Sequence, residues 1–243
     1  MITTRMITTG MITTGMITVC RRCHRDEPTI PHRSAVPALS RQTLGMDRSP
    51  IAAVLLGAGA GSRFTGDAHK LLADLHGTPL YRHALRHVVE ADIGPVVLVT
   101  GAVDLPVPDE YANRVITVHN PSWQSGQSTS LRRGIEEARR LGVAAVAVGL
   151  ADQPGVSSAA WRRLADTGAD LAVAMYEGRR GHPVRIGARH WDELPEGGDF
   201  GARDLLAVHS HDVEQIPCPG TATDIDTAED LATWLRRSPT NSP

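Results

Sequence analysis

Aromatic residues are scarce in this sequence, at 4% of 243 residues, so large rings cannot fill most of its core. The core must come mainly from Ala, Val, Leu and Ile, which favours helices packed on an aliphatic sheet. Hydrophobic residues still reach 41% and charged residues 21%, close to the average of globular domains. The length suits one α/β domain or two small ones.

An excess of charge of either sign is also missing. The 25 Lys and Arg residues nearly balance the 27 Asp and Glu residues, which gives a formal net charge of −2. Such a balance provides no basic surface for nucleic acid or for an anionic membrane. Apolar runs are short as well, and none reaches the roughly 18 residues of a membrane-spanning helix. We therefore expect neither a nucleic-acid partner nor a membrane span.

Cysteine is rare, with Cys20, Cys23 and Cys218 as its three positions. Only Cys218 falls in the part expected to fold, so a disulfide framework is not predicted and a cytoplasmic location is favoured. Cys20, Cys23 and His24 match the C-x-x-C-H pattern of covalent haem attachment. That chemistry requires export, and no apolar signal core precedes the pattern. No second Cys/His pair follows at zinc-finger spacing, so we favour a chance match.

The first 45 residues differ in character from the rest. Residues 1–19 repeat a five-residue unit, MITTR or MITTG, and the stretch up to Gly45 is polar and contains three prolines. Low-complexity sequence of this kind does not bury a face. We predict that residues 1–45 are an upstream extension or a disordered leader, that Met46 is the natural start, and that residues 46–243 form one domain.

From residue 51 onward, apolar runs typical of buried strands alternate with segments of helical periodicity. Strands are predicted at 51–56, 95–100, 115–118, 144–150 and 171–175. Helices are predicted from Thr78, over 130–141, around 159–165 and from Thr227. This order is typical of a Rossmann-like α/β fold, a mostly parallel sheet flanked by helices. Ligands bind such sheets beyond the carboxyl ends of the strands, so residues that follow strands are the candidate site residues.

A glycine-rich loop, GAGAGSR, follows the first predicted strand and occupies residues 57–63. Glycines let the backbone approach a nucleotide and turn its N–H groups toward phosphate oxygens, and Arg63 and Lys70 add positive charge. No Gly-Lys-Ser/Thr follows, so the loop is not a Walker A motif. The third glycine of a dinucleotide fingerprint is missing too, which counts against a dehydrogenase. The alternative is a tight turn with two solvated cations.

Two carboxylates are candidate metal ligands. Asp152 directly follows the predicted strand 144–150, where a carboxylate can hold Mg²⁺ together with water and substrate phosphates. The alternative for Asp152 is a turn or helix N-cap residue. Asp226 precedes the helix that starts at Thr227 and could provide a second metal contact. A capped helix with an acidic first turn would also explain that run.

Hydroxyl side chains at the start of the helix predicted over 130–141 form a further candidate site. Ser128 and Ser130 can cap that helix, or leave its N–H groups free for an anion or the edge of a base. The residues alone do not separate these two alternatives.

Several segments, in the same order, resemble the MobA-like nucleotidyltransferases, and most of all their molybdenum cofactor cytidylyltransferase branch. The matching segments are LLGAGAGSRF followed by Lys70, WQSGQSTSLR, ADQP, RGHPV, GDFGAR and DIDTAED. Gly57 stands where the family usually has Ala, Phe64 replaces the usual Met, and Ala151 replaces the usual Gly of G-D-x-P. The matches extend over about residues 51–236.

The resemblance implies a nucleotide-diphospho-sugar transferase-like fold and a role for each matched residue. Lys70, Arg63 and Asp152 would be catalytic, and Asp152 and Asp226 would hold Mg²⁺. His182 and Arg203 would line the acceptor pocket. The residues implied to hold the nucleotide are Gly57, Ala58, Gly59, Gly61, Ser62, Ser128 and Ser130.

The implied activity is transfer of a nucleoside monophosphate from a nucleoside triphosphate to a phosphorylated acceptor of the molybdopterin type, with release of pyrophosphate. CTP is favoured because Ala58 matches the cytidylyl branch, where the guanylyl branch has Gly. GTP or another acceptor is the nearest alternative. A molybdoenzyme or its maturation factor would be a partner. Two other classes stay open: an NAD(P)H-dependent oxidoreductase, assigned to some relatives on this fold, and a non-catalytic carrier of molybdenum cofactor.

Overall fold

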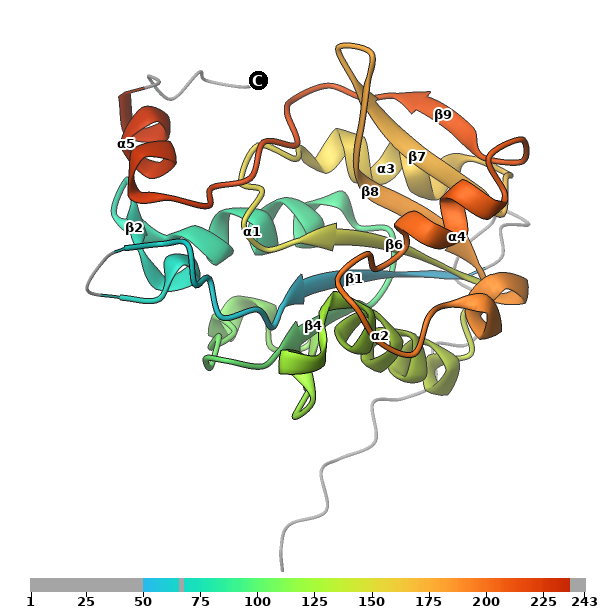
Figure 1. Ribbon diagram of the computed structural model, residues 1–243, viewed down its shortest axis with the longest axis horizontal. Helices are drawn as coiled ribbons and strands as arrows, with labels where there is room; N and C mark the ends of the chain where they lie inside the picture. Colours follow the sequence, from blue (N-terminus) through green and yellow to red (C-terminus); the bar gives the residue numbers. More distant parts are fainter. Residues whose placement is uncertain (1–49, 66–67, 237–243) are drawn as a thin grey trace, which may run out of the picture. The chain divides into compact units, whose positions relative to one another are not determined.

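A seven-stranded sheet is the centre of the protein, whose computed structural model describes residues 50–65 and 68–236. The strand order is β5-β4-β1-β6-β8-β7-β9, and β8 runs antiparallel to both its neighbours while the other pairs are parallel (Figure 1). The strands are β1 (Ile51–Gly57), β4 (Val96–Thr100), β5 (Val115–His119), β6 (Ala145–Leu150), β7 (Leu171–Tyr176), β8 (Arg179–Gly187) and β9 (Glu214–Pro217).

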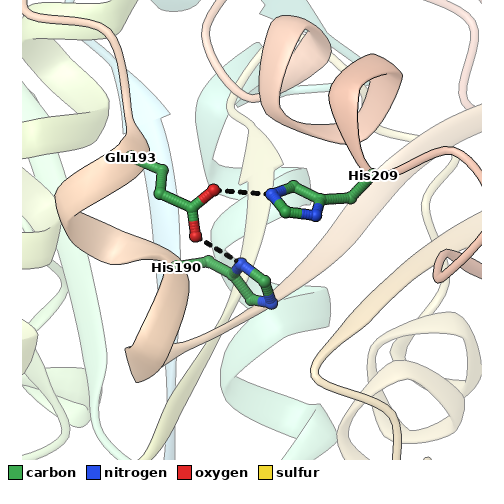
Figure 2. Close-up of side chains that lie close together, drawn as sticks. All are labelled: His190, Glu193 and His209. Carbon is green, nitrogen blue, oxygen red and sulfur yellow. Dashed lines mark hydrogen bonds and ion pairs between the residues drawn. The ribbon is translucent and has the colours of Figure 1, made fainter.

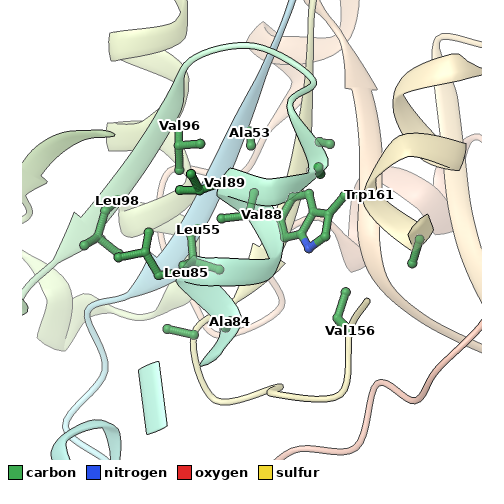
Figure 3. Packing of buried hydrophobic residues seen from close by; sticks show 14 of the residues in the cluster. Ala53, Leu55, Ala84, Leu85, Val88, Val89, Val96, Leu98, Val156 and Trp161 are labelled. Atoms are coloured by element: carbon green, nitrogen blue, oxygen red, sulfur yellow. The ribbon is translucent and has the colours of Figure 1, made fainter. Parts of the chain in front are cut away.

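Helices cover both faces of this sheet, because β1 is apolar on both sides. Ala53 and Leu55 of β1 face one hydrophobic cluster, whereas Ala52 and Val54 face another. The first cluster includes residues of α1 and α3, among them Trp161 (Figure 3), and the second includes residues of α2. The helices are α1 (Leu80–Ala91), α2 (Gln127–Leu141), α3 (Ser158–Asp166), α4 (Arg203–Val208) and α5 (Ala228–Arg236).

The predicted fold class is confirmed, and each predicted strand and helix is present within a few residues of its expected ends. Gly142 ends α2 with φ 67°, as a left-handed helix terminus requires. Thr227 caps α5: its Oγ1 accepts from Asp230 N at 3.1 Å, and Asp230 Oδ2 accepts from Thr227 N at 2.8 Å.

The start of α1 was predicted too early. Thr78 and Pro79 pair as β3 with β2 (Asp74–Leu75), and the helix begins at Leu80. The glycine-rich loop therefore leads into a 3₁₀ turn (Lys70–Leu72) and this small hairpin before α1. Because no α-helix begins directly after the loop, the N–H groups available to a ligand here are those of the loop itself and not those of a helix N-terminus.

Strand β8 has no counterpart in the prediction. Its first half is the polar run RRGHP, which lacks the apolar pattern of a buried strand, and only its second half is buried. The predictions for residues 1–45, including Cys20 and Cys23, lie outside the described residues. Within the described part of the chain, no helix has the length and apolar character needed to cross a bilayer.

Candidate active site

The carboxyl ends of β1 and β6 open into a cleft of about 470 Å³. Parallel pairing brings these ends together, since Leu56 of β1 lies opposite Leu150 of β6. The cleft is lined by the glycine-rich loop, the start of α2 and three acidic side chains, namely Asp152, Asp199 and Asp226. The sequence-predicted residues found there are Gly57, Ala58, Gly59, Gly61, Ser62, Arg63, Lys70, Ser130, Asp152 and Asp226.

Lys70 joins the two predicted metal-binding carboxylates at this cleft. Its Nζ donates to Asp152 Oδ2 at 2.6 Å and to Asp226 Oδ1 at 2.9 Å. Arg63 Nη2 lies 2.9 Å from the second oxygen of Asp226. The carboxylates come from segments 74 residues apart, and the backbone holds them together because Ile225 N donates to the carbonyl of Asp152 at 3.0 Å. Two cations and two anions therefore meet at one point.

The electrostatics of this cluster keep Lys70 charged. Burial alone would lower the pKa of Lys70, but the charges and hydrogen bonds of Asp152 and Asp226 outweigh that effect and raise it. The lysine side chain is 11% exposed, whereas that of Arg63 is 76% exposed. Lys70 is thus a fixed, desolvated cation at the base of the cleft, and Arg63 is a solvated one at its rim.

Glycine is required where the loop passes over the lysine. Gly61 has φ +63°, and a Cβ there would lie 2.8 Å from Cγ of Lys70. The loop is also tied to the segment that follows β4, because Ala102 N donates to the carbonyl of Ala58 at 2.9 Å. Gly59 and Ala60 stay exposed at its tip. The backbone thus lies against the Lys70 side chain with its tip open to solvent.

His69 is a loop contact that sequence reasoning missed. Its Nδ1 accepts from Leu71 N at 3.2 Å, which leaves Nε2 to donate to the carbonyl of Gly59 at 2.9 Å. The pKa of His69 is lowered, mainly by burial and also by the positive charge of Lys70. A lowered pKa favours this neutral tautomer. His69 ties the tip of the loop to the turn that carries Lys70. A histidine beside a lysine carries no periodicity or motif that would have identified this contact.

The carboxylates offer a divalent cation a suitable donor set. Asp152 Oδ1 is buried and has no hydrogen-bond partner among the described residues. Its other oxygen and one oxygen of Asp226 face the same point in the cleft, where Lys70 Nζ now bonds both. Hard oxygen donors of this kind are those that Mg²⁺ and Mn²⁺ select. Asp152 is not a helix cap, since Ser157 caps α3. It lies in a turn in which Gln153 N donates to the carbonyl of Leu150 at 3.4 Å, and its carboxylate accepts from Lys70.

The start of α2 differs from the prediction. Gly126 occupies the N-cap position with no side-chain cap, and Ser128 N is bonded to the carbonyl of Gly198 at 2.9 Å. Ser130 lines the cleft and accepts from Asn120 Nδ2 at 2.9 Å. Ser128 is buried, its Oγ has no partner among the described residues, and it does not line the cleft.

Asp199 and three residues around the α2 start also line the cleft. The three are Trp123, Gln124 and Gln127. The segments of all four, GDFGAR and WQSGQSTSLR, are among those that resemble the family, but no role was predicted for these residues themselves. The approach is very close: a Cβ on Gly126 would lie 2.3 Å from the carbonyl oxygen of Gly198 and 2.8 Å from Asp199 Oδ1. The segment carrying Asp199 therefore packs directly on the α2 start, and only the fold brings residues 126 and 198 together.

The two residues predicted for the acceptor pocket lie outside the residues that line this cleft. Tyr176 Oη donates to the carbonyl of His182 at 2.6 Å. The pKa of His182 is lowered to about 4, chiefly by burial and to a smaller extent by the charge of Arg203, against the opposing effect of Asp152. His182 is therefore neutral at neutral pH, and it lies close enough to Asp152 and Arg203 for both charges to shift its pKa. Arg203 is exposed at the start of α4.

Replacing Gly126 by Ala is expected to reduce nucleotide binding at the cleft at least about tenfold. The φ of +104° strains any side chain at this position, and the new Cβ would force the Gly198 carbonyl and Asp199 away. The measurement is the dissociation constant of CTP by calorimetry. Gly197→Ala is the matched control, because its Cβ would meet only the Ser125 oxygen, at 3.6 Å. Equal CTP affinity in all three proteins would contradict this account of the segment.

A glycine-rich loop and two carboxylates at one edge of a mostly parallel sheet define the class of the protein: a nucleotide-diphospho-sugar transferase-like α/β fold. The family model for the MobA-like NTP transferase domain matches residues 53–214, which is most of the chain. The protein belongs to this family.

Two solved structures share this fold. The fold resembles a nucleotidyl transferase from Methanothermobacter thermautotroptrophicus, with a TM-score of 0.64 and 24% identity over 76% of this chain and 98% of that one. It also resembles Rv0371c of Mycobacterium tuberculosis in complex with manganese, with a TM-score of 0.62 and 24% identity over 78% of this chain and 100% of that one.

A curated relative matches over a short stretch. Choline-phosphate cytidylyltransferase of Haemophilus influenzae is 46% identical over 52 residues, which is 20% of this chain and 22% of that protein. The chain thus spans about a fifth of the length of that relative.

Proposed function

We propose that the protein transfers CMP from CTP to a phosphorylated small-molecule acceptor of the molybdopterin type and releases pyrophosphate. The observation that carries the proposal is the cluster in which Lys70 bridges Asp152 and Asp226 beside the glycine-rich loop. The likeness of a short stretch to a cytidylyltransferase supports CTP as the donor.

The chemistry proposed is an in-line displacement. An oxygen of the acceptor phosphate forms a bond to the α-phosphorus of CTP, while the bond from that phosphorus to the bridging oxygen breaks and pyrophosphate leaves with the electron pair. The acceptor oxygen is already ionised, so no general base is needed. The protein contributes positioning and charge, which supply most of the rate in such reactions.

The described residues divide this work. Backbone N–H groups at the exposed loop tip, Gly59–Gly61, would bind phosphate oxygens. Lys70 would exchange its carboxylate partners for phosphate oxygens as substrate binds, and Arg63 would add charge from the rim. Asp152 and Asp226 would hold Mg²⁺, which would neutralise charge on the triphosphate. Trp123 and Gln127, which line the same cleft, would contact the nucleoside.

A thermal-shift screen of the four nucleoside triphosphates tests the donor. CTP with Mg²⁺ at about 100 times its dissociation constant adds about 2.7 kcal/mol to the stability, which for a domain of this size raises Tm by about 5–10 °C. We expect smaller shifts with GTP, ATP and UTP, and smaller shifts without Mg²⁺. A larger shift with GTP would assign the guanylyl reaction instead.

Release of pyrophosphate tests the reaction itself. Incubation with CTP, Mg²⁺ and a molybdopterin-type acceptor is expected to release one pyrophosphate per acceptor consumed. A nicotinamide-dependent absorbance change without pyrophosphate would point to the oxidoreductase. Binding of the acceptor without any turnover would point to the carrier.

A further inference from the structure

A second cluster of metal-binding side chains lies away from the cleft. His190 and Glu193 belong to the 3₁₀ segment Ala188–Glu193, and His209 caps the end of α4. Glu193 Oε1 lies 2.8 Å from His190 Nδ1, and Glu193 Oε2 lies 2.5 Å from His209 Nε2 (Figure 2). One ligand atom from each of the three residues lies within 4.8 Å of the others.

The cluster lies at the end of the sheet opposite the nucleotide cleft. The segment Ala188–Glu193 continues from β8, whose last residue, Gly187, pairs with Ala145 at the start of β6. Asp152 follows the other end of β6. The length of a strand therefore separates the two groups of ligands, and this cluster belongs to neither the glycine-rich loop nor the predicted acceptor residues.

The donor atoms differ in kind from those of the cleft. Two imidazole nitrogens and a carboxylate oxygen are the ligand set of Zn²⁺ and chemically similar divalent ions, whereas Mg²⁺ requires oxygen donors and octahedral geometry. In a tetrahedral zinc site the ligand atoms lie about 3.4 Å apart, so atoms now within 4.8 Å need only a small side-chain movement. Glu193 is 43% exposed and free to make it, while His190 is 8% exposed and fixed.

Neighbouring residues set how the histidines present their nitrogens. The carboxylate of Asp212 lies 4.0 Å from His209 Nδ1, the nitrogen that faces away from Glu193. A carboxylate hydrogen-bonded to that nitrogen would orient the histidine as a metal ligand, and Asp212 would have to approach more closely to do so. Arg189, by contrast, disfavours metal binding by His190. Its Nε donates to His190 Nε2 at 3.0 Å, so the proton of the neutral His190 ring lies on Nδ1. A metal can bind Nδ1 only if that proton moves to Nε2, which requires Arg189 to release Nε2. Arg189 could then pair with Asp170 alone, whose Oδ2 already lies 2.9 Å from Arg189 Nε.

The site also has a structural consequence for the cleft. Glu193 and His209 are the two ends of a segment that contains Asp199, which lines the cleft, and Arg203, at the start of α4. An ion bound by both Glu193 and His209 would hold the two ends of this segment together and limit the movement of the residues between them.

We propose that His190, Glu193 and His209 form a binding site for Zn²⁺ or a chemically similar divalent ion, which joins the two ends of the segment 194–208. Solvent supplies the remaining ligand through the exposed side of Glu193. The site is distinct from the Mg²⁺ site of the proposed reaction, and its existence does not depend on that reaction.

Titration of the metal-stripped full chain with Co²⁺, followed by visible absorption, tests the site, with Zn²⁺ as competitor. Cys20 and Cys23 are replaced by Ser in every protein used, because their thiolates would bind both metals. We expect one Co²⁺ per chain to give a spectrum of nitrogen and oxygen ligation, distinct from the all-oxygen ligation that the carboxylates of the cleft would give. Glu193→Gln should weaken binding at least about 100-fold, more than the loss of an outer partner does. Glu196→Gln, a nearby exposed carboxylate, is the matched control and should bind like the parent.

Two further variants separate this site from its alternatives. Arg189→Ala should tighten binding several-fold, because it removes the donor that holds the proton on His190 Nδ1, and misfolding would not produce such a gain. Asp152→Asn should leave the nitrogen-ligated Co²⁺ spectrum and its affinity unchanged, since it affects only the cleft. Equal Co²⁺ affinity in Glu193→Gln and the parent, or no binding at micromolar Co²⁺, would show that the cluster is only a hydrogen-bond network and would overturn the proposal.

Discussion

Replacement of Asp152 by Asn is expected to lower the rate of pyrophosphate release by about 10²–10³-fold, the usual cost of removing one positioned charge-stabilising group. The amide keeps the shape of the side chain but loses the negative charge that faces Lys70 at 2.6 Å, and it replaces one of the two carboxylate oxygens by an NH₂ group that cannot bind a cation. The backbone tie from Ile225 N to the carbonyl of residue 152 persists, so the fold should survive.

The measurement is kcat for pyrophosphate release across a range of Mg²⁺ concentrations, with circular dichroism as a check on folding. If Asp152 holds the ion, Asn should also raise the Mg²⁺ concentration needed for half-maximal rate. Asp224→Asn is the matched control. Asp224 lies near Asp152 but does not line the cleft, and it accepts from Gln153 Nε2 at 2.6 Å. Full activity of Asp152→Asn, or an equal loss in both variants, would remove Asp152 from the reaction.

Replacement of Lys70 by Met should separate metal binding from catalysis. Lys70 competes with a cation for the space between Asp152 and Asp226, since its Nζ bonds both. Met removes the competing charge and leaves two carboxylates that repel each other. We expect tighter Mn²⁺ binding without nucleotide, together with a fall in kcat of about 10²–10³-fold, because the positive charge of the lysine that would stabilise the transferred phosphate is lost.

Mn²⁺ affinity is measured by calorimetry on the variant and the parent, and kcat by pyrophosphate release. Lys70→Arg is the control that retains the charge, and it should recover part of kcat while binding Mn²⁺ no more tightly than the parent. Weaker Mn²⁺ binding in Lys70→Met would mean that the lysine supports the carboxylates rather than competing for their place. An unchanged kcat would show that Lys70 takes no part in the transfer.

Much of the fold was predictable because its central strands are strongly apolar and its helices have clear ends. The run IAAVLL could only be a strand buried on both faces, and Gly142 could only follow a helix. Strand β8 escaped because RRGHP is polar, although its partner strands supply the hydrogen bonds that hold it in the sheet. The early start assigned to α1 came from reading Pro79 as a first-turn residue when it pairs in a hairpin.

The candidate site was predictable only in part. Gly59, Gly61, Lys70, Asp152 and Asp226 were accessible from motif spacing, and all of them line the cleft. Contacts between residues far apart in sequence carried no such signal. Asp199 reaches the cleft because Gly126 lacks a side chain, and His69 holds the loop tip through a backbone carbonyl.

The sequence by itself determined most of the buried strands, the place of the glycine-rich loop and the carboxylates that follow strand ends, because these depend on local composition and periodicity. Only the tertiary structure decided that Lys70 lies between Asp152 and Asp226. The same holds for the meeting of His190, Glu193 and His209 beyond the opposite ends of the strands. Such meetings depend on strand order and on the packing of distant segments. Neither leaves a pattern in a single chain read residue by residue.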